Sequence, residues 1–366
     1  MIIWRGAAII AALCMFWWGP VAAQSVTLSL KDGSFSVSGR LRSFDGEFYD
    51  LDSALGPMTW SALTTDCFGD ACPDPKDYTP YIRIAGSAAL GEILVPALIE
   101  SFASQRGWTL VARAVSNATV EIDVLRADDV RVAIFEISLS STEAGYAGLA
   151  NGEADIVLAR RAPVAAELAQ LQDTYTGGST NPVRSRVIGW EHLRLYTNET
   201  NPISALTVSA LASMTAEPDA TWPGEDGQKL HLRGDLDSVL AMRQQLGQDG
   251  PAGALGTGAD TDPGVLYVTP NPSLPLQPVA LSPTCGPLPT TLSISNDVHP
   301  LSAPMYVVTS AIRQSSFLRE FLDFTLDLPA QRVVARAGFL SRTPTEAPLA
   351  SENGLLVNAI LNATSE

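Results

Sequence analysis

The sequence predicts a mixed α/β protein of about two domains, preceded by a small all-β module. Residues 25–66 alternate apolar and polar side chains between turn signals such as Lys-Asp-Gly, which is typical of short β-hairpins. From residue 81 onward, short apolar strands alternate with amphipathic helices, which is the pattern of an α/β architecture. The chain has 366 residues, of which 46% are hydrophobic, so it can bury a sizeable core.

Residues 1–23 have the composition of a secretory signal peptide. Arg5 precedes the apolar run AAIIAALCMFWW, and the small residues Val-Ala-Ala follow, so we expect cleavage after Ala23. The run is shorter than the roughly 20 apolar residues that span a bilayer. Two alternatives stay open. One is an uncleaved anchor, and the other is lipidation of Cys14, although Leu13 stands where a small residue is needed.

The small β module covers residues 24–66, and a linker with three prolines covers residues 67–80. Cys67 and Cys72 lie close together at the start of this linker, and we expect a local disulfide between them in an oxidising compartment. Cys285 is expected to be a lone thiol. The alternative is that all three cysteines are unpaired and structurally minor.

The first half of the α/β region contains a helix with apolar residues at helical spacing, namely Leu90, Leu94, Leu98 and Phe102. Because strands and helices alternate, we expect mainly parallel strands. The predicted elements are the strand YIRIAG, the helix SAALGEILVPALIESFASQRG, the strand WTLVARAV, the hairpin EIDVLRADDVRVAIFEISL, a short helix and the strand DIVLAR.

The second half continues in the same style and ends in a tail at residues 342–366. Thr207 and Asp235 are plausible amino-terminal caps of two helices. The predicted elements are the strand RVIGWEHLRLYTN, the helix TVSALASM, the strand KLHLRG, the helix DLDSVLAMRQQLG, extended stretches that include SISNDVHPLSAPMYVVTS, the amphipathic helix SSFLREFLDFTLDL and the segment QRVVARAGFLS.

Composition and motifs argue against several functions. The chain has 39 acidic and 23 basic residues, so nucleic acid is not an expected partner. His192, His231 and His299 lie far apart without metal-ligand spacing, and no nucleophile elbow, phosphate-binding loop or CxxC motif is present. We therefore expect no enzyme, no cofactor and no metal.

Two strand-to-helix joins are the first candidate binding elements. AGSAAL contains Gly86, Ser87 and Ala88, and SLSSTEAG contains Ser140, Ser141 and Thr142. Helix amino termini carry unpaired N–H groups and a partial positive charge, so two of them facing a common space would bind an anion, with the hydroxyls as additional donors. The alternative is that these residues are ordinary helix caps.

Arg160 and Arg161 are the second candidate element, at the carboxyl end of the strand DIVLAR. Ligands of open α/β sheets bind at such strand ends, and guanidinium groups recognise carboxylate or phosphate. Since successive strand residues point to opposite faces, we expect only one arginine to enter the site. The alternative is that one arginine neutralises Asp155 or Glu153 and the other is solvated.

Five stretches then follow one another in a characteristic order. They are IRIAGSAALGEILVPALIESF, STEAGYAGLANGEADIVLARRAP, VIGWEHLRLYTNETNPISALTVSALASM, HPLSAPMYVVTS and LREFLDFTLDLPAQRVVARAGFLS. In this order they resemble the phosphate-binding proteins of bacterial ABC importers and the wider periplasmic-binding-protein superfamily. The resemblance implies a two-lobed fold over residues 81–341. One lobe would combine residues 81–186 with residues 310–341, the other would hold residues 198–290, and crossovers near 187–197 and 293–309 would join them.

The candidate site departs from the family pattern on both lobes. Arg161 corresponds to the family's arginine, whereas Arg160 replaces a small or acidic residue. In the second lobe Arg233 and a helix are present, but the family's Ser-Gly-Thr is missing. Asp235 and Asp237 stand in its place and would repel an anion. The small β module also resembles that of envelope proteins with a carboxy-terminal peptidoglycan-binding domain, which has no counterpart among the five stretches.

Together these observations predict an exported, periplasmic solute-binding protein. It would capture a small anion, phosphate-like or otherwise acidic, between its lobes without chemistry, and would serve an ABC permease. The alternative is a module of the cell envelope that binds another envelope component and whose ligand site is degenerate.

Overall fold

The computed structural model describes residues 25–75, 77–174, 183–217, 220–222, 228–248, 262–270, 276–282, 301–311 and 314–343. The predicted signal peptide, the residues Cys14, Cys285 and His299, and the chain after residue 343 lie outside these ranges. Contacts divide the chain between Pro80 and Tyr81 into two units, each described here by itself.

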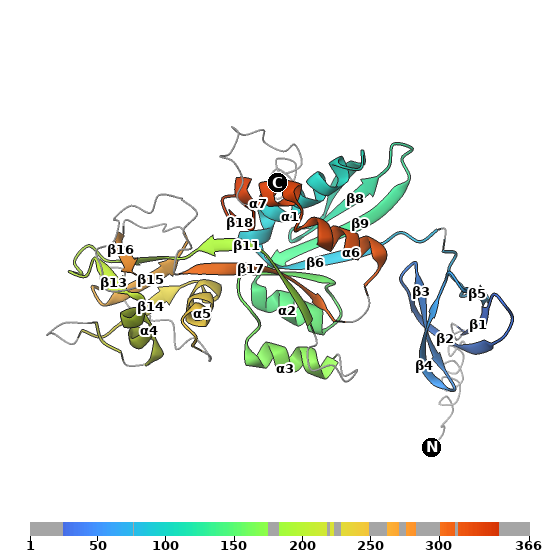
Figure 1. Ribbon diagram of the computed structural model, residues 1–366, viewed down its shortest axis with the longest axis horizontal. Helices are drawn as coiled ribbons and strands as arrows, with labels where there is room; N and C mark the ends of the chain where they lie inside the picture. Colours follow the sequence, from blue (N-terminus) through green and yellow to red (C-terminus); the bar gives the residue numbers. More distant parts are fainter. Residues whose placement is uncertain are drawn as a thin grey trace, which may run out of the picture. The chain divides into compact units, whose positions relative to one another are not determined.

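The amino-terminal unit is a five-stranded antiparallel sheet in the order β4-β3-β2-β1-β5 (Figure 1). Its core consists of Val26, Leu28, Tyr49 and Leu51. Cys67 on β5 forms a disulfide with Cys72, as predicted. The strands are β1 (Ser25–Leu30), β2 (Ser36–Phe44), β3 (Phe48–Ser53), β4 (Gly56–Ser61) and β5 (Thr65–Phe68).

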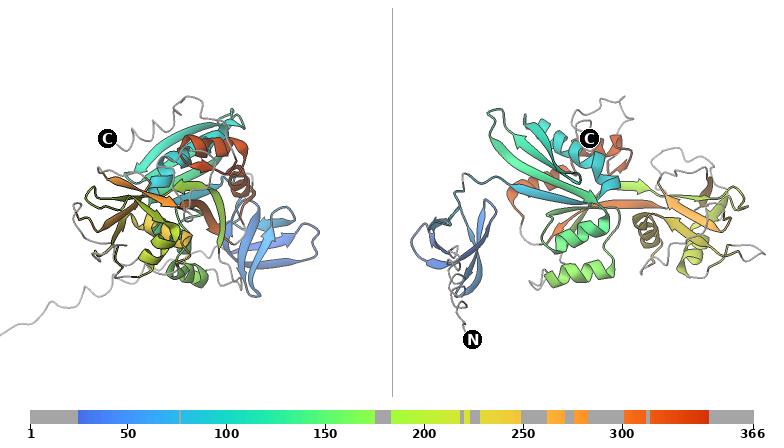
Figure 2. Two further views of the ribbon diagram at one scale, coloured as in Figure 1. Left: turned by 60° about the vertical axis from the view of Figure 1, so that its left-hand side comes forward. Right: turned by 180° about the vertical axis from the view of Figure 1, so that it is seen from behind.

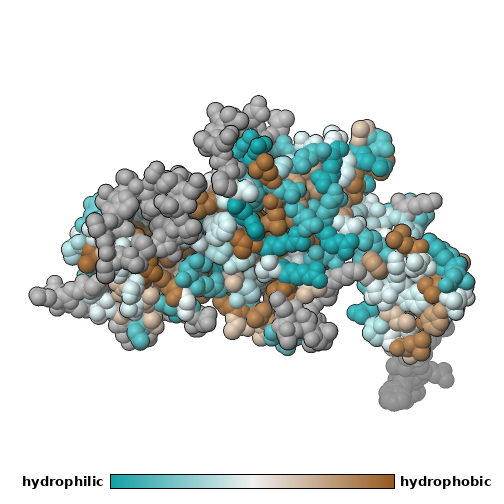
Figure 3. Space-filling view, viewed as in Figure 1, coloured by the Kyte–Doolittle hydropathy of each residue, from teal (hydrophilic) through white to brown (hydrophobic). Residues whose placement is uncertain are grey.

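Several apolar side chains remain exposed on this unit. Brown patches mark it in Figure 3, and the large exposed apolar residues are Phe35, Leu55, Leu63 and Phe68. By contrast, hydrophilic side chains gather over the lobe that contains β8, β9 and α6 in the same view. A sheet of this size has room for only a few buried side chains, so part of its apolar surface stays in solvent.

The second unit contains a first lobe built on an eight-stranded sheet in the order β18-β11-β17-β10-β6-β9-β8-β7. Its elements are β6 (Tyr81–Ser87), α1 (Ala88–Ser104), β7 (Thr109–Ser116), β8 (Thr119–Leu125), β9 (Arg131–Ser140), α2 (Thr142–Ala150), β10 (Ile156–Ala159), α3 (Ala165–Thr174), β11 (Val183–His192), β17 (Ser302–Ser310), α6 (Ser316–Phe324), α7 (Leu328–Arg336) and β18 (Leu340–Ser341).

Helices cover both faces of this sheet. Figure 1 shows α1, α6 and α7 on one face and α2 and α3 on the other. On the first face, Phe102 of α1 is fully buried and its ring meets the rings of Phe317, Phe321 and Phe324 edge to face. Such contacts add to the burial of apolar area. The predicted apolar stripe of α1 is therefore the side of the helix that packs into the core.

The strand directions differ from the sequence prediction of mainly parallel pairing. Only β10–β6 and β6–β9 are parallel in the eight-stranded sheet, and all other neighbours are antiparallel. A parallel pair needs a crossover, which here only α1 and α2 with their flanking segments supply. The predicted hairpin is confirmed as β8–β9, and β7 adds to it antiparallel.

The second lobe is a smaller mixed sheet in the order β13-β16-β12-β15-β14, with α4 and α5 packed against it. Its elements are β12 (Arg194–Thr197), β13 (Ala205–Thr207), α4 (Val208–Ala216), β14 (His231–Gly234), α5 (Leu236–Gln245), β15 (Val265–Thr269) and β16 (Gln277–Ser282). The predicted fold class, two α/β lobes with a small amino-terminal all-β module, is confirmed.

Two chain segments connect the lobes, and both run along the long antiparallel pair of β11 and β17 (Figure 2). At its end, the backbone N–H of Leu193 donates to the carbonyl of Leu301 at 3.1 Å. Beside it, the Ser302 hydroxyl lies 3.3 Å from Nδ1 of His192. The two connections are thus joined to each other where the chain leaves one lobe for the other.

None of the helices in the described part of the chain is both long and apolar enough to cross a membrane.

Gly86 lies in a very close backbone approach near the carboxyl end of β6. Its φ is +125°, and a Cβ there would lie 2.2 Å from the carbonyl oxygen of Leu158 on β10. A side chain at this position would therefore strain the backbone and push β6 and β10 apart.

Replacing Gly86 by alanine should lower the free energy of unfolding by about 1–3 kcal/mol, which is the cost of a single strained backbone conformation. The matched control is Gly148→Ala in α2, where a Cβ meets only Ala154 at 3.6 Å. This change should be neutral or stabilise by up to about 1 kcal/mol, since alanine favours a helix. Urea unfolding of both variants measures the two effects, and equal stabilities would contradict the prediction.

Candidate functional site

The three strand ends that the sequence singled out meet at one edge of the first lobe. In the parallel register, Gly86 on β6 lies beside Leu139 on β9 and Leu158 on β10, and Ser87 lies beside Ser140. The helices α1 and α2 start directly after β6 and β9. The structure therefore brings both predicted joins and the arginine pair to neighbouring positions.

The hydroxyl groups of these joins have different surroundings. Ser87 is buried before Ala88, the first residue of α1, and its side chain makes no capping hydrogen bond. Ser141 caps α2, because its hydroxyl accepts a hydrogen bond from the N–H of Ala144 at 3.1 Å, as the alternative of ordinary helix caps expected. Thr142 is fully buried, and its hydroxyl accepts from the backbone N–H of Arg160 at 3.3 Å. Ser140 is exposed.

Arg160 and Arg161 are both buried, with side chains only 6% and 1% exposed. The prediction that only one arginine enters the site is therefore wrong. The alternative, in which one arginine neutralises Asp155 or Glu153 and the other is solvated, is also wrong, because neither arginine is solvated and Asp155 pairs with Arg83. The physical reason is that β10 ends at Ala159 and the chain bends at the two arginines. Strand alternation does not apply beyond the strand.

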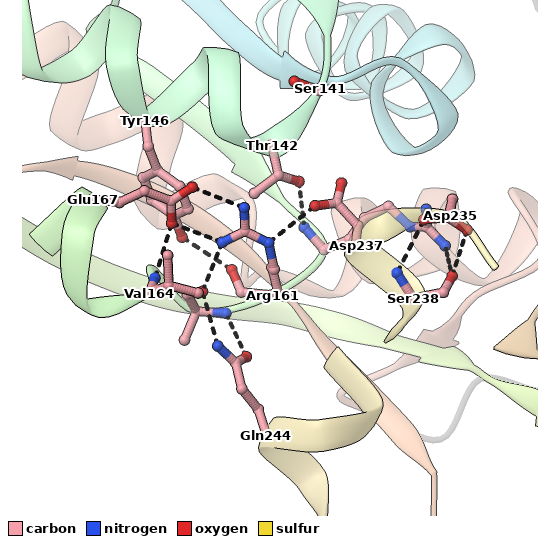
Figure 4. A network of polar contacts seen from close by, with 12 residues as sticks. Ser141, Thr142, Tyr146, Arg161, Val164, Glu167, Asp235, Asp237, Ser238 and Gln244 are labelled. Atoms are coloured by element: carbon pink, nitrogen blue, oxygen red, sulfur yellow. Dashed lines mark hydrogen bonds and ion pairs between the residues drawn. The ribbon is translucent and has the colours of Figure 1, made fainter. Parts of the chain in front are cut away.

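Arg161 lies between a carboxylate of its own lobe and one of the other lobe (Figure 4). Its Nη1 and Nη2 donate to the two oxygens of Glu167 at 2.7 and 2.8 Å, which is the bidentate geometry of guanidinium and carboxylate. Its Nε donates to Asp237 on α5 at 3.0 Å. The Tyr146 hydroxyl donates to the Arg161 carbonyl at 3.0 Å and fixes the backbone behind the side chain.

Arg160 has the same double attachment. Its Nε donates to Glu191 of β11 at 2.9 Å, and its Nη1 donates to Asp235, the residue before α5, at 2.8 Å. Its Nη2 donates to the hydroxyl of Ser238 at 2.9 Å. Each arginine therefore pairs with one carboxylate from the first lobe and one from the second.

The side chain of Gln244 completes the contact of α5 with the first lobe. Its Oε1 accepts from the N–H of Ala162, and its Nε2 donates to the carbonyl of the same residue, both at 3.1 Å. Asp237 and Gln244 are seven residues apart and so lie on one face of α5. The spacing of Asp237 and Gln244 could therefore have identified this face of α5 from the sequence. No sequence pattern could have identified Glu167 and Glu191, because the fold determines their contacts.

Arg233, the predicted site residue of the second lobe, lies on β14, where its backbone pairs with that of Tyr267. It stands two residues before Asp235, whose carboxylate accepts from Arg160. The family resemblance implied a role for it in the second lobe, but α5 presents Asp235 and Asp237 to the first lobe instead.

The charges of this cluster are unequal. Two guanidinium groups face four carboxylates, those of Glu167, Glu191, Asp235 and Asp237. Burial alone would lower the pKa of both arginines, but the adjacent carboxylates outweigh it and hold the pKa values above the ordinary range. Burial raises the pKa of Glu191, although Arg160 opposes this shift.

The cluster forms ion pairs across the junction of the two lobes. Within the described ranges, no group of three or more His, Cys, Asp or Glu side chains is placed to hold a metal ion.

Comparison with known proteins finds no matching family model and no matching curated protein. Several solved structures share part of the arrangement. An ABC-type phosphate transport receptor from Vibrio cholerae is 15% identical with a TM-score of 0.47, over 71% of this chain and 99% of that one. PstS from Borrelia burgdorferi is 14% identical with a TM-score of 0.40, over 72% and 98%. The BenM effector binding domain with its effector benzoate is 14% identical with a TM-score of 0.35, over 75% and 99%. Matches at this level assign no family.

Removing the Arg161 side chain should lower the free energy of unfolding by about 3–5 kcal/mol, because Glu167 and Asp237 would stay buried without their counter-ion. The matched control is Arg113→Ala, which removes an arginine that is 54% exposed and paired with Glu121 on the surface. That change should cost no more than about 1 kcal/mol. Chemical denaturation compares the two variants, and a similar loss in both would show that the Arg161 cluster is not buried as described.

The raised pKa of Glu191 predicts a pH dependence of stability. The folded chain keeps a proton on Glu191 at a pH where the unfolded chain, with a value near 4.5, has released it. The stabilising contribution of this proton is full below pH 4.5 and is lost as the pH rises through the folded pKa. The stability of the wild type relative to Glu191→Gln should therefore fall as the pH rises above 4.5. A difference in unfolding free energy that does not change with pH would contradict this.

Proposed function

We propose that the chain is an exported, two-lobed binding protein that recognises a small acidic ligand between its lobes. The observation that carries the proposal is the buried arginine pair at the lobe junction. Arg160 and Arg161 bind carboxylates through charge-assisted hydrogen bonds, and half of these carboxylates come from the opposite lobe. A ligand with carboxylate or phosphate-like groups would use the same donors.

The connection between the lobes supports binding by hinge motion. Two segments link the lobes, and they are joined to each other at Leu193 and Leu301. Rotation about two adjacent backbone segments opens or closes the lobes without repacking either core. In this proposal residues 81–186 and 310–341 move against residues 198–290, the protein carries out no reaction, and an ABC permease receives the ligand.

Export to the periplasm is the second part of the proposal. The amino-terminal sequence is typical of a signal peptide, and the disulfide between Cys67 and Cys72 suits an oxidising compartment.

A second candidate function is an interaction module of the cell envelope whose ligand site is degenerate. The observation in its favour is that the arginine donors are already used by the protein's own carboxylates. Under this alternative the lobes stay closed, and the partner is another envelope component rather than a small anion.

A melting screen distinguishes the two functions. Phosphate, sulfate, organic acids and peptidoglycan fragments should each be added at millimolar concentration and low salt. A true ligand at about 100 times its dissociation constant should stabilise the folded form by about 2.7 kcal/mol and raise the melting temperature. Arg113→Ala should respond like the wild type because its surface ion pair lies on β7 and β8. No shift with any compound would contradict ligand binding and leave the interaction module as the better hypothesis.

A further inference from the structure

The carboxylate of Asp235 occupies a position that has the donors of an anion-binding site. Its Oδ1 accepts from the backbone N–H of Ser238 at 3.0 Å and from Nη1 of Arg160 at 2.8 Å. Its Oδ2 accepts from the Ser238 hydroxyl at 2.6 Å. A helix amino terminus, a hydroxyl and a guanidinium group thus converge on one carboxylate, and these are donors that a free anion would also use.

The donors come from both lobes and are well buried. Ser238 is 1% exposed and belongs to α5 of the second lobe, whereas Arg160 is 6% exposed and follows β10 of the first lobe. The Asp235 side chain itself is 47% exposed. Solvent therefore reaches the carboxylate from one side, while the groups that hold it are fixed by the protein.

Asp237 has the corresponding position at the second arginine. Its Oδ1 accepts from Nε of Arg161 at 3.0 Å, and the remaining side of that guanidinium is bound by both oxygens of Glu167. Neither arginine offers two parallel N–H groups to a free anion in this closed arrangement. The excess of two carboxylates over the two arginines opposes a further negative charge.

We infer that Asp235 is a tethered ligand, which together with Asp237 closes the lobes in place of a free anion and determines which acidic molecules the junction excludes. The inference rests on the proposed function in taking this junction as the ligand site. It adds that small inorganic anions are excluded from the wild-type chain because the place they would take is already filled by a covalently attached carboxylate.

Chemical rescue tests the inference. Asp235→Gly removes the carboxylate but keeps the helix start, since glycine is accepted as a helix cap and the residue has φ −68° and ψ 151°. The variant should melt at a lower temperature than the wild type. Formate should raise its melting temperature saturably, whereas chloride at equal ionic strength should not, and the wild type should show no saturable response to formate.

Two further variants make the outcome specific. Asp235→Gly combined with Arg160→Ala should bind formate at least about tenfold more weakly than Asp235→Gly alone, because a charge-assisted hydrogen bond is lost. Glu217→Gly removes an exposed carboxylate after α4 in the same lobe and should give no response to formate. Asp235→Ser, which keeps a capping hydroxyl and leaves room for an anion, serves the same test if the glycine variant does not fold.

The inference is overturned if neither Asp235→Gly nor Asp235→Ser responds to formate, or if the wild type responds equally. Rescue that persists without the Arg160 side chain would also overturn it, because formate would then bind elsewhere. These results are independent of the ligand screen on the wild type. Rescue without any wild-type ligand would contradict the proposed function alone, and a wild-type ligand without rescue would contradict only the tethered-ligand inference.

Discussion

Two buried guanidinium groups are the constraint on which the arrangement of the lobes depends. A charged side chain that leaves water must find opposite charge and hydrogen-bond acceptors, or it destabilises the fold by several kcal/mol. Within the first lobe, Glu191 and Glu167 balance the charges of Arg160 and Arg161. They do not accept from Nη1 of Arg160 or from Nε of Arg161, which donate instead to Asp235 and Asp237 of the second lobe. Docking of α5 therefore completes the hydrogen bonds of the two guanidinium groups, and Gln244 adds two backbone hydrogen bonds beside them.

The same constraint connects stability with binding. Arg160, Arg161 and the amino terminus of α5 are groups that would hold a small anion, but at the lobe junction they hold the protein's own carboxylates. An external ligand must replace these contacts and separate α5 from the first lobe. The two connections between the lobes, linked through Leu193 and Leu301 and beside His192 and Ser302, leave such a motion open, because they pass side by side from one lobe to the other. Under the proposed function, ligand binding and lobe opening are therefore coupled.

Local sequence patterns predicted the elements well because local interactions determine them. The apolar spacing of α1, the cap at Ser141 and the hairpin of β8 and β9 each depend on residues within one or two turns of chain. Predictions that reached beyond one element were less reliable. Most neighbouring strands of the eight-stranded sheet are antiparallel. Only the pairs β10–β6 and β6–β9 are parallel, and these are the pairs that the crossovers through α1 and α2 allow. Both arginines are buried because the regular strand ends at Ala159, one residue before them.

The sequence by itself determined the class of the fold and the disulfide, since these follow from patterns within short segments, and it placed Ser87, Ser140 and the arginine pair at the carboxyl ends of strands. Their meeting depends on the pairing of β6 with β9 and β10. Only the tertiary structure decided which charges meet. Glu191 and Asp235 lie 31 and 75 residues from Arg160 along the chain, and no periodicity relates them. Their pairing follows from the packing of α5 against the end of β10, where buried guanidinium groups need carboxylates and water cannot take their place.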